Sequence, residues 1–318
     1  MKYSKLLVGV SALTCAIAVP FAFAGQNGSA PGVPVSMVVT LEGKDHKAIP
    51  PIEAQDITVL QGKEKRPVTN FVPAGQNGGG MQLLMLIDDS AGFSFGAEIS
   101  VLKQFVNSLP ATTEIAIGYM RNGTNQMAAN FTSDHAAAAN SIRLPLGMGG
   151  ADVSPYDSLS DAIRRWPERN TDQQGFVRRE VIMISSGLEN LGGGFTPDNP
   201  YVSRGIQDAQ KAGVVVYTIY NPSAGHYGHS FWRYNWGQNF LSQLSDETGG
   251  ESYMIGFSAP VSFQPFLQQI MEQMQHQYVL TFDAKPENKP GLQPVKVRVT
   301  EKDASIAAAD KVYVKAGV

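Results

Sequence analysis

Two carboxylates and a hydroxyl stand at the end of an apolar run, where their oxygens could do chemistry. Asp88, Asp89 and Ser90 directly follow residues 83–87, a run of leucine, methionine and isoleucine that is typical of a buried strand. In an open α/β sheet, ligands bind outside the carboxyl ends of the strands. Oxygens placed there could take part in binding a ligand. In the alternative interpretation, Asp88 accepts hydrogen bonds from backbone amides of its own loop.

A second unusual segment is rich in aromatic side chains. Residues 225–236 follow a predicted strand over residues 214–220, which puts them on the same carboxyl-end face as Asp88. Tyrosine, tryptophan and arginine are favoured at recognition sites because they offer a large contact area. The alternative is a loop that packs its rings over the edge of its own sheet. The candidate partner-binding residues are Tyr227, Phe231, Trp232, Arg233, Tyr234 and Trp236.

The residue pattern gives little support to catalysis. Asp88 and Asp89 would point to opposite sides of an extended strand, which argues against a general acid and base pair. The only cysteine is Cys15, and no serine lies in a G-x-S-x-G motif with an evident histidine and acid partner. His226 and His229 could share a zinc ion, but no third ligand is adjacent. The sequence therefore predicts a protein that is not an enzyme.

The elements that must position these residues alternate between strand and helix. The hydrophobic pattern predicts strands over residues 83–87, 114–120, 126–131, 180–185, 214–220 and 251–255. Helices are predicted over residues 95–109, 134–143, 155–166, 202–212, 238–248 and 260–275. Thr132 or Ser133 should cap the second helix, and Ser154 the third, where Pro155 suits the first helical position. Such alternation is typical of an α/β fold with a doubly wound, mostly parallel sheet.

Strands without helices are predicted at both ends of the chain. They cover residues 35–41, 56–60 and 66–72 at one end, and 277–282, 295–300 and 312–315 at the other. Neither group makes a good core by itself, so we expect them to pack together as a small flanking β unit. The predicted organisation is N-terminal strands over residues 35–73, an α/β domain over 81–275 and C-terminal strands over 276–318.

The first residues have the form of a signal peptide. Lys2 and Lys5 precede an apolar stretch over residues 6–23, and Ala22-Phe23-Ala24 has the small-x-small pattern that signal peptidase cleaves. We expect removal of residues 1–24 on export to the periplasm or the external medium, which leaves a flexible leader over residues 25–34. The alternatives are an uncleaved membrane anchor and a lipoprotein modified at Cys15.

Charge narrows the class of partner. Removal of the two lysines of the signal peptide leaves 23 basic residues against 28 acidic ones, a net charge near −5. An acidic protein of this kind is not suited to nucleic acid or to an anionic membrane surface. No later segment is apolar enough to span a bilayer, so we expect no membrane insertion after signal removal.

Several short motifs follow one another in the order found in a known family. They are residues 84–92, Gly149-Gly150 ahead of residues 156–159, residues 181–187 and the tyrosine-bearing strand 278–282. With the strand pair 35–39 and 56–59 in front of them, they resemble a von Willebrand factor type A domain, and more closely the exported VWFA-related proteins of Acidobacteria. The resemblance covers most of the mature chain and implies a Rossmann-like sheet.

The resemblance also implies a site for a divalent cation. Type A domains commonly hold one at a metal-ion-dependent adhesion site, built from a D-x-S-x-S motif, a threonine on a second loop and an aspartate on a third. Asp88 and Ser90 match the first two positions, but Gly92 stands where the second serine belongs. Ser186 stands where the third-loop aspartate is expected.

On the second and third loops, other oxygen-bearing residues would have to replace the ligands that are missing. The second loop has no threonine but could offer Asp152 or Ser154, and Glu189 could replace the missing aspartate. Such a degenerate site should bind Mg²⁺ or another divalent cation weakly, because affinity depends on ligand charge and fit. The tentative ligands are Asp88, Ser90, Asp152, Ser154 and Glu189.

The predicted function is a non-catalytic binding module that mediates protein–protein interaction or adhesion. Its partner would bind the carboxyl-end face of the sheet. The alternative is a module that binds carbohydrate or a cell-surface ligand through residues 225–236, and a third possibility is a hydrolase of unrecognised type.

Overall fold

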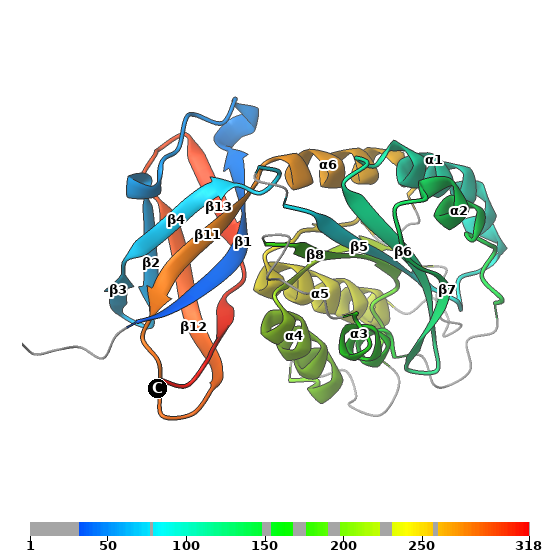
Figure 1. Ribbon diagram of the computed structural model, residues 1–318. Helices are drawn as coiled ribbons and strands as arrows, with labels where there is room; N and C mark the ends of the chain where they lie inside the picture. The colour runs from blue at the N-terminus through cyan, green and yellow to red at the C-terminus, as the bar shows by residue number, and fades with distance from the viewer. Residues whose placement is uncertain are drawn as a thin grey trace, which may run out of the picture.

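The computed structural model describes residues 32–76, 79–147, 154–167, 176–189, 198–222, 231–256 and 260–317. A β-sandwich lies beside an α/β domain, and the two are packed against each other (Figure 1). None of the helices in these ranges has the length and apolar character needed to span a membrane.

The α/β domain is built on a sheet with the order β10-β9-β8-β5-β6-β7 among the described residues. Its strands are β5 (Met81–Asp88), β6 (Thr113–Arg121), β7 (Thr124–Thr132), β8 (Arg178–Ser185), β9 (Val214–Tyr220) and β10 (Ser252–Tyr253). All neighbouring pairs are parallel except β6 and β7. The predicted doubly wound, mostly parallel sheet is confirmed.

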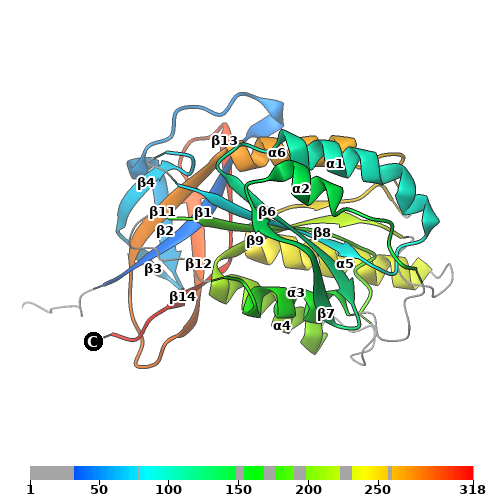
Figure 2. The same cartoon turned by 45° about the vertical axis from the view of Figure 1, so that its right-hand side comes forward.

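Helices cover both faces of this sheet (Figure 2). One face carries α1 (Ile99–Ser108), α2 (His135–Asn140) and α6 (Gln264–Gln275), and the other carries α3 (Pro155–Arg164), α4 (Pro200–Ala212) and α5 (Phe231–Thr248). Side chains alternate along β5 as a strand requires, so Met85 packs into the first core and Leu86 into the second.

Local capping explains where the helices start. Ser154 accepts a hydrogen bond from the Asp157 amide, and Pro155 occupies the first turn of α3, as predicted. The predicted cap of α2 was wrong, because Asp134 accepts from the Ala137 amide while Thr132 accepts from the Asp134 amide. The helix predicted from residue 95 begins instead as a 3₁₀ turn, η3 (Phe93–Glu98).

The strands from the two chain ends form the sandwich, as predicted. Its sheets have the orders β13-β1-β11-β4 and β14-β12-β2-β3. The strands are β1 (Val33–Gly43), β2 (Ile57–Gln61), β3 (Glu64–Arg66), β4 (Val68–Pro73), β11 (Gln277–Ala284), β12 (Gly291–Val299), β13 (Ala304–Ala308) and β14 (Lys311–Val314), with short 3₁₀ turns η1 (Lys44–His46) and η2 (Ala54–Asp56). Val39 from one end and Phe282 from the other share one core.

A buried polar cluster joins the sandwich to the α/β domain. Gln277 of β11 accepts a hydrogen bond from Arg178 Nη1 at 2.5 Å and donates one to the Tyr217 hydroxyl at 3.0 Å. Glu180 is fully buried beside them, 3.6 Å from Arg178 Nη1. Burial raises the pKa of Glu180 from 4.5 to about 7, against the opposing effects of Arg178 and Gln277.

This pKa predicts a pH-dependent stability. Because the folded-state pKa of Glu180 is raised, its contribution is fully present below about pH 4.5 and is lost as the pH rises through 7. We expect this group to lower the free energy of unfolding by about 3 kcal/mol between these limits, at about 1.4 kcal/mol per pKa unit. Urea unfolding from pH 5 to pH 8 measures how the free energy of unfolding depends on pH, and Glu180→Gln should remove this part of the dependence. Parallel plots of the free energy of unfolding against pH for the two proteins would contradict the prediction.

Candidate functional site

The site lies where the strand order of the α/β sheet reverses. The chain passes from β5 to β6 on one side, and β8 pairs with β5 on the other. Ligand sites of doubly wound sheets lie at such a switch point, outside the carboxyl ends of the strands. Asp88 ends β5 and Ser185 ends β8, and both are buried there.

Asp88 is held by hydrogen bonds from within the protein. Its Oδ1 accepts from the amide of Ser90 at 3.0 Å and from the Ser90 hydroxyl at 2.6 Å, and its Oδ2 accepts from the Ser185 hydroxyl at 3.0 Å. Burial raises the pKa of Asp88, while these hydrogen bonds oppose the rise. The bond from the Ser90 amide is of the kind the alternative interpretation predicts, and the bond from Ser185 in addition ties the ends of two central strands together.

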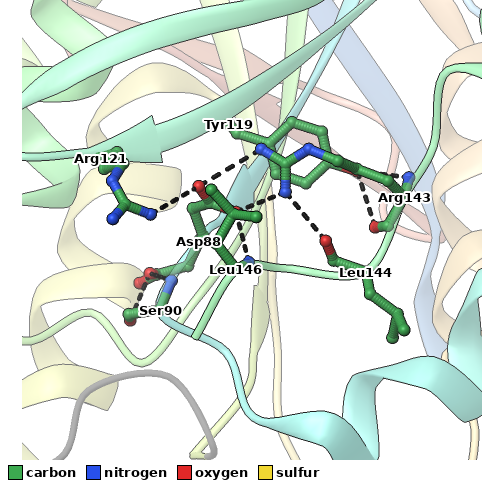
Figure 3. Close-up of polar contacts among 8 residues, drawn as sticks. Asp88, Ser90, Tyr119, Arg121, Arg143, Leu144 and Leu146 are labelled. Atoms are coloured by element: carbon green, nitrogen blue, oxygen red, sulfur yellow. Dashed lines mark hydrogen bonds and ion pairs between the residues drawn. The ribbon is translucent and has the colours of Figure 1, made fainter. Parts of the chain in front are cut away.

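Asp89 is bound by two arginines, Arg121 and Arg143, which Figure 3 shows near Asp88 and Ser90. Its Oδ1 accepts from Arg143 Nη1 at 2.7 Å and from the Leu146 amide at 2.9 Å, and its Oδ2 accepts from Arg121 Nη1 at 3.2 Å. Burial acts to raise the pKa of Asp89, but the hydrogen bonds from Arg143 and Leu146 leave it lowered. Arg143 also stacks on the Tyr119 ring, with 3.8 Å from its guanidinium carbon to the ring centroid.

Sequence reasoning missed both arginines. Arg143 lies 54 positions from Asp89, and neither it nor Arg121 belongs to a motif. The available signal was the burial expected of Asp89, since a buried carboxylate needs a charged or hydrogen-bonding partner.

The two arginines should differ in their effect on stability. Arg143 makes two hydrogen bonds to Asp89, one to the Leu144 carbonyl and a ring contact, whereas Arg121 makes one bond to Asp89. Arg143→Ala is therefore expected to lower the free energy of unfolding by about 2 kcal/mol, and Arg121→Ala by less than about 1 kcal/mol. Urea unfolding at pH 7 measures both, and equal losses would show that Arg143 has no special role.

The second and third loops meet beside Asp88. The Ser154 hydroxyl donates to Glu189 Oε2 at 2.5 Å and accepts from the Asp157 amide. Ser154 lines, together with Asp88 and Ser90, a cavity of about 20 Å³, which is room for one water-sized atom. The structure thus brings four tentative ligands together, and the fifth, Asp152, lies outside the described residues.

The described donors do not fit a magnesium site. Mg²⁺ requires near-octahedral oxygen ligands with carboxylate charge. Both oxygens of Asp88 already accept hydrogen bonds, and Glu189 is bound to Ser154. Arg121 also lines this cavity, and its positive charge, held beside Asp89, opposes a cation. Within the described ranges, no three histidine, cysteine, aspartate or glutamate side chains are grouped to hold a metal ion.

A metal titration tests this conclusion. Calorimetry with Mg²⁺ and Mn²⁺ up to millimolar concentration should show no saturable heat that depends on Asp88. The matched control is Asp88→Asn, which keeps the side-chain size and removes the charge. Binding that is present in the unchanged protein and lost in this variant would show that Asp152 or Glu189 completes a cation site.

The aromatic segment is in part a helix and not the predicted loop. Helix α5 begins at Phe231, and Tyr227 lies outside the described residues. The Trp236 ring lies tilted against the Phe240 ring one turn on, and Trp236 packs with Tyr234 against the core. Phe231 and Trp232 are exposed, and their role in partner binding stays a prediction.

Glycine lets α5 approach the third loop closely. A Cβ atom on Gly237 would lie 2.1 Å from the carbonyl oxygen of Ser186, so only a glycine fits. Gly187 in that loop has a φ of 70°, which also favours glycine. This contact brings the start of α5, with Arg233 in its first turn, to the carboxyl-end side of β8.

Exposed apolar side chains gather around this end of the sheet. Phe93, which follows β5, is 94% exposed, and Trp232 at the start of α5 is 72% exposed. Leu144 and Leu146, in the segment held by Asp89, are also exposed. We call Phe93, Leu144, Leu146, Phe231 and Trp232 the apolar rim.

Comparison with known proteins gives similar folds and no sequence relative. No family model matches the chain, and neither does any curated protein. One similar solved structure is a mutated aerotolerance-related membrane protein from Bacteroides fragilis, with 13% identity and a TM-score of 0.44, and the match covers 61% of this chain and 98% of that one. A second is the SpRpn10 VWA domain, with 15% identity and a TM-score of 0.41, and the match covers 59% of this chain and 94% of that one. A third is the ArnB paralog VWA2 from Sulfolobus acidocaldarius, with 11% identity and a TM-score of 0.37, and the match covers 90% of this chain and 73% of that one.

Two of these three structures are described as VWA domains. Their TM-scores are low, so the fold assignment rests on the strand order and connections of the chain itself. The narrower likeness to exported proteins of Acidobacteria stays a prediction.

Proposed function

We propose that this chain is a non-catalytic module that binds a protein partner on the carboxyl-end face of its α/β domain. The observation that carries the proposal is the exposure of the apolar rim, because large exposed apolar side chains on the carboxyl-end side of the sheet favour an interaction site there. Aromatic residues such as Phe93 and Trp232 supply large contact area for little conformational entropy.

The polar groups beneath the rim support this use of the face. Asp88 ties β5 to β8, and Asp89 holds the segment that carries Leu144 and Leu146. A surface that is already ordered loses less entropy on binding than a flexible one. In this proposal the carboxylates position the binding face and do not contact the partner, and binding needs no divalent cation.

The cellular setting is part of the proposal. The signal-peptide pattern of residues 1–24 supports export to the periplasm or the external medium, where the module would meet its partner.

Site-specific crosslinking tests the binding face. With benzoylphenylalanine at position 93, the protein should crosslink to a discrete partner in the cells that make it, because the photoreactive group resembles the exposed Phe93 ring. Trp232→Ala should lower the yield about tenfold, the effect of losing roughly 1.4 kcal/mol at an aromatic anchor. The control places the photoreactive residue at Met127, an exposed position of β7, and equal crosslinking there would refute the proposed face.

A second candidate function rests on the exposure of Trp232. Its ring stands edge to face with Phe231, 6.1 Å between centroids, and an exposed indole can stack on a sugar. A glycan array distinguishes this candidate, since carbohydrate binding that is lost in Trp232→Ala, without a crosslinked protein, would favour it.

A further inference from the structure

A groove of about 520 Å³ lies where the sandwich meets the α/β domain. Its walls come from β1 and β14 on the sandwich side, and from the end of α4 and the start of β9 on the other. The start of β9 is at the amino edge of the parallel sheet, opposite to Asp88, so this groove is separate from the apolar rim. A volume of this size is typical of ligand sites, which often lie between domains.

One wall of the groove is an open strand edge. Strand β1 pairs with β11 from Val33 to Thr40, but it pairs with β13 only from Val39 to Gly43. Residues 35–38 line the groove and, within the described chain, are paired with no strand on the β13 side, although β14 packs near β1. Strand β14, which also lines the groove, is the edge strand of the other sheet. An open edge is a template for an added strand.

The charged residues that line the groove are basic, with the carboxylates of Glu247 and Asp310 next to it. Arg179, Lys211 and Lys311 line it, and none of the described lining residues is acidic. Lys311 Nζ lies 3.8 Å from Glu247 Oε2, a loose pair, and Lys211 lies over the Tyr313 ring at 5.6 Å. The walls between these cations are largely apolar, with valines from β1, β9 and β14.

We propose that this groove binds an extended acidic segment of a partner protein, which adds as a strand beside residues 35–38 of β1. Its alternate side chains would meet the apolar walls, and its carboxylates would meet Lys211 and Lys311. The leader of this chain is a poor occupant, because residues 1–31 contain no acid. The proposal is independent of the carboxyl-end face, so Trp232→Ala should leave it unchanged.

Labelled peptides test the proposal. The probes are two fluorescein-labelled octapeptides of alternating valine and a charged residue, one with glutamate and one with lysine, measured by fluorescence anisotropy. The glutamate peptide should bind, the lysine peptide should not, and the affinity should fall with added salt. N-methylation of alternate amides in the glutamate peptide should abolish binding, because an added strand depends on main-chain hydrogen bonds. Hydrogen exchange at residues 35–38 should slow when the peptide is bound.

Charge reversal locates the site. Lys211→Glu combined with Lys311→Glu should weaken binding of the glutamate peptide about tenfold, because two attractive charge contacts become repulsive. Lys63→Glu, at an exposed turn of the sandwich, is the matched control and should change nothing. The proposal is overturned if the glutamate peptide does not bind, or if the lysine peptide or the N-methylated peptide binds equally well. It is also overturned if a peptide of residues 25–34 binds as well as the glutamate peptide, or if the chain forms a dimer in which residues 35–38 are protected from hydrogen exchange without peptide.

Discussion

The burial of strand β5 on both faces and along both edges is the constraint on which the structure depends. Every residue from Met81 to Asp88 is buried, β6 and β8 flank the strand, and helices cover it on each side. A strand in this position can end in a carboxylate only if the protein supplies hydrogen-bond donors. Ser90 and Ser185 supply them for Asp88, and two arginines do so for Asp89. The chemistry at this end of the sheet follows from that requirement.

The same requirement separates the polar groups from the proposed binding face. The carboxylates that could have held a cation are committed to the protein's own donors, and they fix the segments around them. What these segments present outward is apolar, as with Leu146 and Phe93. A face of this kind is suited to a protein surface, whose affinity comes from buried apolar anchors.

The β-sandwich, with its own core, is attached at the opposite edge of the sheet. Strands from both chain ends build the sandwich, and Gln277 connects it to Arg178 and Tyr217 in the α/β domain. Glu180 is buried in this polar cluster, and the free-energy cost of its burial rises with pH. Because β13 leaves β1 at Val39, the joint also leaves an open strand edge beside a groove lined by cations.

The sequence by itself determined the local features: the buried run that becomes β5, the Ser154-Pro155 start of α3 and the strand and helix alternation, because these depend on neighbouring residues. It did not determine that α5 begins at Phe231, since the aromatic residues there are weak helix formers and only packing on the third loop extends the helix. The meeting of Asp89 with Arg143 and the direction of Asp88 toward Ser185 were decided by the tertiary structure. Both depend on contacts between distant parts of the chain, and no local pattern records them.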